Sequence, residues 1–169
     1  MAFPLHPETP EDGMTLEELF AGKPIDIKKA MARLKKVADE LGLALGERTR
    51  TCNSRLAQEL AKWAGSEGKG DPFHEAVFRA YFVDGINIGR VDALVALAKS
   101  VGLPGEKAGL VLELRTFKEA VDSDWERSHA LRITGVPTFV VDHQATVGFQ
   151  AYEDLEEFLK HCGVRKRSP

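Results

Sequence analysis

The sequence predicts an α/β fold in which a long helical segment interrupts a small sheet. Apolar residues recur at the spacing of an amphipathic helix through the middle of the chain, whereas β-branched and aromatic residues form short runs near its two ends. The chain has 169 residues, of which 43% are hydrophobic and 29% are charged. This length and composition are typical of a globular domain that buries a core without disulfides or metals.

The first expected element is a short strand over residues 2–7, an apolar run followed by the turn-forming residues 8–13. Pro4 and Pro7 each lack an N–H group, so this strand can pair fully along neither edge. The start of the chain therefore predicts a strand with incomplete hydrogen bonding.

Several helices are expected next. Gly42 supplies the C-terminal cap of the first helix, Asn53 or Ser54 can cap the second, and the pair Asp71-Pro72 favours the start of the third. The aromatic residues at helical spacing are expected mostly in the core; they are Trp63, Phe78, Tyr81, Phe82 and Trp125. The expected helices cover about 25–41, the region of 56–63, 71–85, 91–101, a short stretch after Pro104, and 117–131.

Sheet signals return in the last quarter of the chain. Residues 133–141 are rich in β-branched side chains, Asp142 and His143 form a turn, and residues 145–147 make the returning strand of a hairpin. A last helix carries Tyr152 and Leu159 on its apolar side. We therefore expect a hairpin followed by a helix.

Charge and cysteine content exclude several classes of function. The formal net charge is −3, which gives no electrostatic case for binding nucleic acid or an anionic membrane. The two cysteines, Cys52 and Cys162, exclude a disulfide scaffold and a cysteine-rich zinc site, and we expect separate reduced thiols in a cytoplasmic protein. No metal-ligand spacing is found among the histidines, which are His6, His74, His129, His143 and His161.

The most specific motif is Gly135-Val136-Pro137-Thr138 before an apolar strand. Proline at a strand start costs a ladder hydrogen bond. A cis Val136–Pro137 bond would turn the backbone of Val136 outward, where an extended peptide or thiol ligand could pair with it by strand addition. An ordinary trans proline at an edge strand fits the four residues equally well.

This motif, together with the blocks 53–60, 78–85 and 86–88, resembles the DsbA family. The closest branch is its FrnE-type members, and 2-hydroxychromene-2-carboxylate isomerases and kappa-class glutathione transferases are related. The resemblance implies a thioredoxin-like α/β fold with a large all-α insertion. Residues 1–12 and 132–162 would form the thioredoxin-like part, 13–131 the helical insertion and 163–169 a tail.

The resemblance also implies a site and a gap. Val136 and Pro137 would hold the substrate, and Thr138 would start the strand behind them. The family places a Cys-X-X-Cys pair after a first strand, and this chain contains no such pair. An N-terminal βα unit of about 30 residues is therefore expected to be missing before residues 3–7. Three arrangements remain open: a start further upstream, strand exchange with a second copy, or pairing of residues 3–5 with 138–140.

The family resemblance implies a protein thiol–disulfide oxidoreductase that acts on a thiol- or disulfide-containing protein or small molecule. Because the Cys-X-X-Cys pair is absent, we expect no dithiol exchange by this chain itself. The first alternative is a glutathione-dependent isomerase or transferase, with glutathione as the only implied cofactor. The second is a non-catalytic module that binds peptides or forms a homodimer by strand exchange. Cys52, just before a helix start, is the one candidate nucleophile, and the other interpretation is a small residue at a loop-to-helix junction.

Overall fold

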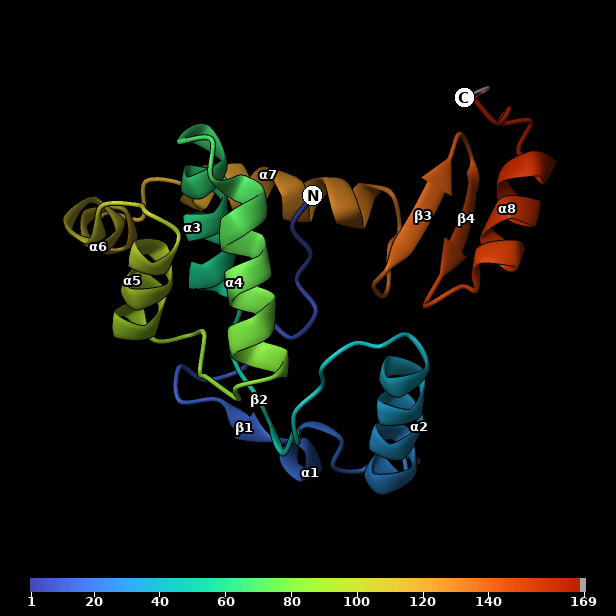
Figure 1. Cartoon of the computed structure of the whole chain (residues 1–169), viewed down its shortest axis with the longest axis horizontal. Coiled ribbons are helices and arrows are strands. Elements are labelled where there is room, and N and C mark those ends of the chain that lie inside the picture. Colours follow the sequence, from blue (N-terminus) through green and yellow to red (C-terminus); the bar gives the residue numbers. More distant parts are fainter. Residues whose placement is uncertain (168–169) are drawn as a thin grey trace. The chain divides into compact units, whose positions relative to one another are not determined.

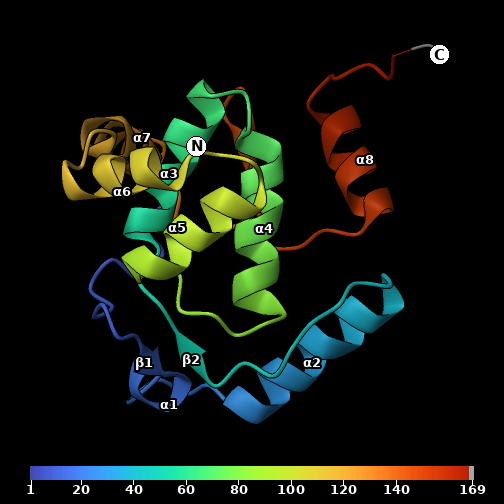
Figure 2. The ribbon, with the colours of Figure 1, turned by 60° about the vertical axis from the view of Figure 1, so that its left-hand side comes forward.

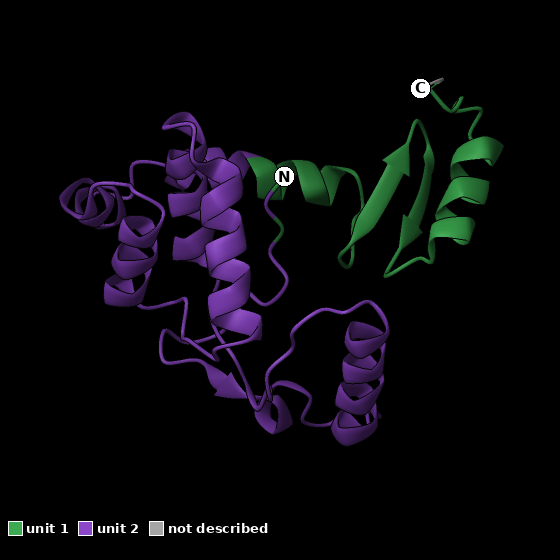
Figure 3. Cartoon of the chain, in the orientation of Figure 1, with its two compact units in different colours: residues 1, 3, 124–169 green, residues 2, 4–123 purple. Residues whose placement is uncertain are grey.

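The computed structural model describes residues 1–167 and contains two compact units (Figures 1 and 3). The helical unit comprises Ala2 and residues 4–123, and the hairpin unit comprises Met1, Phe3 and the residues from 124 onward. The elements are β1 (Met14–Thr15), α1 (Leu16–Leu19), α2 (Ile27–Glu40), β2 (Arg50–Thr51), α3 (Arg55–Ser66), α4 (Gly70–Phe82), α5 (Val91–Ser100), α6 (Gly105–Glu113), α7 (Lys118–Ala130), β3 (Thr138–Val141), β4 (Gln144–Val147) and α8 (Tyr152–His161).

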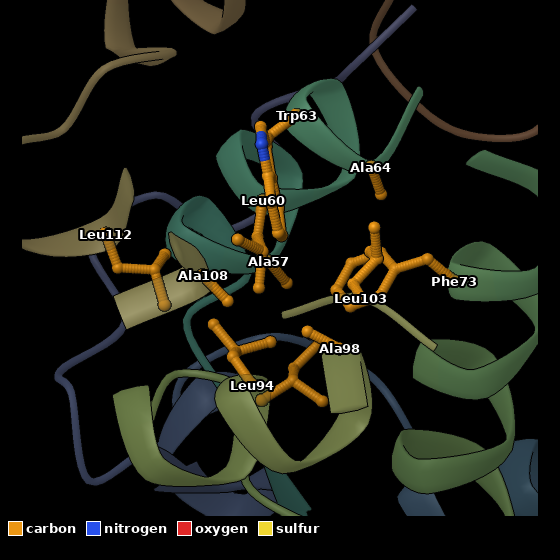
Figure 4. Close-up of a cluster of buried hydrophobic side chains, with 11 residues drawn as sticks. Ala57, Leu60, Trp63, Ala64, Phe73, Leu94, Ala98, Leu103, Ala108 and Leu112 are labelled. Carbon is orange, nitrogen blue, oxygen red and sulfur yellow. The ribbon is translucent and has the colours of Figure 1, made fainter. Parts of the chain in front are cut away.

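The predicted α/β class is confirmed, since most elements are helices and two short antiparallel sheets accompany them. In the helical unit, α3 packs against α4, α5 and α6. The core forms where their apolar stripes meet (Figure 4). Its side chains are Ala57, Leu60, Trp63, Ala64, Phe73, Ile88, Leu94, Ala98, Leu103, Ala108 and Leu112.

Capping residues mark where several helices begin and end. Asp26 accepts a hydrogen bond from the backbone N–H of Lys29 (2.9 Å) and so caps α2. Ser54 occupies the N-cap position of α3, while the side chain of Asn53 accepts from the N–H of Arg55 (2.9 Å). Gly42 follows α2 in the left-handed conformation (φ 67°) that favours glycine.

The expected strand over residues 2–7 is wrong, because residues 1–13 form loops and turns. Side-chain amides donate hydrogen bonds to the backbone carbonyls at the end of this segment. Asn53 Nδ2 donates to the carbonyls of Pro7 (3.3 Å) and Thr9 (2.7 Å), and Asn87 Nδ2 donates to that of Glu11 (2.9 Å). The prolines remove further donors. Within residues 1–167, β3 pairs with β4 and no strand is formed at residues 3–5, so the expected pairing of residues 3–5 with 138–140 is not found.

The first strand instead lies at Met14–Thr15 and pairs antiparallel with Arg50–Thr51. Thr15 then begins α1 with a reciprocal capping box, in which its hydroxyl accepts from the N–H of Glu18 (3.1 Å) and the carboxylate of Glu18 accepts from the N–H of Thr15 (2.7 Å). The predicted tail of residues 163–169 lies partly outside the described residues, at 168 and 169.

Candidate functional site

The motif predicted to hold the substrate lies at the start of a hairpin in the hairpin unit. β3 pairs antiparallel with β4, with Thr138 opposite Val147 and Val141 opposite Gln144. The Thr138 hydroxyl donates to the carbonyl of Gly135 (2.6 Å), which fixes the turn before the strand. The Val136–Pro137 peptide bond is cis. Sheet signals over 133–141 thus yield a shorter strand, because the first residues form this turn.

One edge of β3 is open. Gly148 N–H donates to the Pro137 carbonyl (2.8 Å), so Pro137 faces β4. Because hydrogen-bonded residues alternate along an antiparallel ladder, Phe139 and Val141 also face β4, whereas the peptide groups of Thr138 and Val140 face the other edge. Residues 1–167 place no third strand in this sheet. The open edge, defined by Thr138 and Val140, therefore presents unpaired N–H and C=O groups.

The two faces of the hairpin differ. Cys162, at the end of α8, lies 3.5 Å (Sγ to Oε1) from Gln144 of β4, so this face is turned toward α8. Side chains alternate between faces along a strand. Val140 and Val147 therefore share the opposite face, where they are 41% and 50% exposed, and Val136 is 48% exposed. Apolar surface thus adjoins the open edge.

The environment of Cys52 does not suit a nucleophile. This thiol lies between β2 and α3, half-buried against the helical core. Burial raises its pKa, and a backbone hydrogen bond with Ile88 and the nearby Arg50 and Arg48 only partly offset that effect. Reactive cysteines need the opposite shift. The position of Cys52 between β2 and α3 fits the interpretation of a small residue at a loop-to-helix junction.

A buried ion-pair network was missed by the sequence reasoning. The Glu59 side chain is fully buried and accepts hydrogen bonds from Arg55 Nε (2.6 Å), Arg115 Nε (2.7 Å) and Arg115 Nη2 (2.6 Å). Arg55 Nη2 also donates to Asp122 (2.6 Å). The Arg55–Glu59 pair has the i, i+4 spacing of a helical ion pair, which is the one local signal for it. The network connects α3 to the turn between α6 and α7.

The pKa of Glu59 follows from these contacts. Burial acts to raise it, but the hydrogen bonds and charges of Arg115 and Arg55 outweigh burial and hold it below its ordinary value. Glu59 is therefore ionised at neutral pH, and its charge is compensated by the two arginines. We assign it a role in stability.

Two further findings concern metals and membranes. Within residues 1–167, no group of three or more His, Cys, Asp or Glu side chains is arranged to hold a metal ion. In the same part of the chain, every helix is too short or too polar to cross a bilayer.

Comparison with known proteins identifies relatives. The Bacillus subtilis (strain 168) uncharacterized protein YwbO is 37% identical over 108 residues, which are 62% of this chain and 52% of that protein. The chain thus spans about half the length of this curated relative.

Solved structures are similar as well. The crystal structure of a probable DsbA oxidoreductase from Streptomyces coelicolor is 25% identical with a TM-score of 0.81, covering 98% of this chain and 75% of that one. A 2-hydroxychromene-2-carboxylate isomerase, 19% identical with a TM-score of 0.65, covers 81% of this chain and 66% of that one, and shares the fold. A family model described as a DSBA-like thioredoxin domain matches residues 1–160. The resemblance to the DsbA family is confirmed, and the chain belongs to the DsbA-like thioredoxin domain family.

Proposed function

We propose that this chain binds thiol- or disulfide-containing substrates as an extended segment along the open edge of β3, beside Val136, Pro137 and Thr138. The observation that carries the proposal is the open edge itself, where Thr138 and Val140 have unpaired peptide groups next to the exposed Val136. Strand addition satisfies such groups and supplies affinity through main-chain hydrogen bonds. Membership of a thiol–disulfide family supports the substrate class.

We further propose that this chain does not itself catalyse dithiol exchange, because its sequence contains no Cys-X-X-Cys pair. The expected result is no reduction of insulin by dithiothreitol above the uncatalysed rate when the 169-residue chain is added. The Cys52→Ser variant should behave identically, since burial raises the pKa of this thiol. Turnover by the chain that disappears in Cys52→Ser would contradict the proposal.

Strand addition is tested by amide hydrogen exchange with a cysteine-containing hexapeptide. At a peptide concentration of about ten times the Kd, exchange at Thr138 and Val140 should slow about tenfold. Phe139 and Val141 should change little, because β4 already pairs with them. A peptide N-methylated on its backbone is the control and should give no protection. Equal protection by the methylated peptide would contradict strand addition.

The glutathione-dependent isomerase or transferase is the second candidate, because glutathione is itself a peptide whose amides can pair with the same open edge. Protection of Thr138 and Val140 by glutathione, and not by the hexapeptide, would favour it. A hexapeptide with serine in place of cysteine separates thiol recognition from general peptide binding. If Thr138 and Val140 are protected in the absence of peptide, and this protection increases with protein concentration, a homodimer formed through β3 would instead be indicated.

A further inference from the structure

A row of aromatic rings lies along α4 in the helical unit, with His74 and Phe78 exposed and Phe82 partly buried. His74, Phe78 and Phe82 follow one another at intervals of four residues, and their ring centroids are 4.6 Å and 5.4 Å apart. The expectation that Phe78 lies in the core is wrong, since it is 50% exposed. The buried side of α4 is occupied by Phe73 instead, which is fully buried. The ring row is therefore a surface feature, which core packing does not require.

An arginine lies at the end of this row. The segment between α2 and β2 passes the C-terminal end of α4 (Figure 2), where Gly46 N–H donates to the Phe82 carbonyl (2.8 Å). Any β-carbon on residue 46 would collide with the Val83 carbonyl, so only glycine allows this approach. The guanidinium carbon of Arg48 thereby lies 5.2 Å from the centroid of Tyr81 and 5.9 Å from that of Phe82.

The charge of Arg48 is not matched by a carboxylate. Its guanidinium donates to the Tyr81 hydroxyl (2.8 Å), the Thr51 hydroxyl (3.4 Å) and the Arg50 carbonyl (3.3 Å), all neutral oxygens. Among residues 1–167, no acidic side chain lies within 4.0 Å of it, whereas Arg115 is paired with Glu59. Tyr81 thus holds a half-buried cation in place without neutralising it. An ionised partner makes a stronger hydrogen bond with such a group than a neutral one does.

We propose that the ring row and Arg48 bind an extended peptide segment with aromatic side chains at alternate positions, followed by an acidic residue. Residues four apart on a helix are about 6 Å apart along its axis. Alternate side chains of an extended strand point to one side and are about 6.6–6.8 Å apart. Two such aromatic side chains would lie along successive turns of α4, against the rings of the row, and the acidic side chain would reach Arg48. The proposal goes beyond the proposed function, because it concerns the helical unit.

The test uses fluorescein-labelled peptides and fluorescence anisotropy with the full chain. The first peptide has the order Phe-Ser-Phe-Ser-Glu with an amidated end, and the second ends in glutamine. The glutamate peptide should bind about tenfold more tightly. Arg48→Gln should abolish this difference, and Arg48→Lys should retain part of it. Phe78→Ser should weaken binding of both peptides about tenfold.

Matched variants control for charge and apolar surface. Arg79→Gln removes an arginine of α4 that already lies close to Asp84 (3.9 Å). Leu110→Ser removes an apolar side chain of α6 whose exposure (55%) is similar to that of Phe78. Both should bind the glutamate peptide as the parent chain does. Circular dichroism would verify the fold of each variant.

Three results would overturn the proposal: equal affinity for the two peptides, an equal loss in a control variant, or no saturable binding up to about 1 mM. A fourth would be slowed hydrogen exchange at Thr138 and Val140 on addition of the glutamate peptide, because the peptide would then occupy the open edge of β3. Failure of hexapeptide binding at β3 would leave this test unaffected.

Discussion

Replacing Arg115 with methionine is expected to lower the free energy of unfolding by about 3–5 kcal/mol. Glu59 is fully buried, and Arg115 provides two of its three hydrogen bonds from arginine. Without Arg115, the carboxylate would keep Arg55 alone, and a buried charge that loses its partner is costly. Chemical denaturation at neutral pH measures the change.

The matched control is Lys118→Met, which removes an exposed partner of Asp122 (2.7 Å) and should cost less than about 1 kcal/mol. pH gives a second readout. Because the folded-state pKa of Glu59 is lowered, its contribution is complete at neutral pH and is lost as the pH falls through that folded-state value. Loss of Arg115 should raise this pKa, so the stability difference between the two chains should narrow as the pH falls through the folded-state pKa of Glu59 in the variant. A difference that stays small at neutral pH would contradict the assigned role.

Replacing Phe73 with alanine is expected to destabilise the protein by about 3–5 kcal/mol. The Phe73 side chain is fully buried among α3, α4 and α5, where no solvent can fill the space it leaves. The large effect combines lost transfer free energy with a residual cavity.

The same substitution at Phe78, five residues further along α4 and 50% exposed, is the control. It should cost less than about 1 kcal/mol, because little apolar surface returns to water. Comparable losses at the two positions would show that Phe73 is not the packing residue described. The two free-energy changes are measured by chemical denaturation. They can be compared when the dependence of the unfolding free energy on denaturant concentration is the same for both variants, which indicates the same unfolding transition.

The helices could be predicted because burying one side of a helix requires apolar residues every three to four positions in the sequence. The stripe expected over 91–101 corresponds to α5, Val91–Ser100, and the hairpin turn expected at Asp142 and His143 lies between β3 and β4. Both signals are local, since neighbouring residues alone determine them.

The errors arose where distant residues decide the structure. Residues 2–7 are apolar enough for a strand, but Asn53 and Asn87 bind the carbonyls that follow them. Glu59 meets Arg115 across 56 residues of sequence, and Arg48 meets Tyr81 across 33. The spacing of apolar residues along the sequence does not indicate which distant residues form such pairs. The family resemblance located the motif Gly135–Thr138, whereas the partners of Glu59 and of Arg48 could be found only from the structure.

The short length of β3 has a consequence for behaviour at high concentration. An exposed, uncharged strand such as Thr138–Val141 invites edge-to-edge aggregation between molecules. Here β3 spans only Thr138–Val141, and the turn at Asp142, with φ at 51°, ends it after four residues. Because only Thr138 and Val140 face the open edge, a strand added there can form only a few main-chain hydrogen bonds. A short edge strand of this kind limits edge-to-edge growth between molecules.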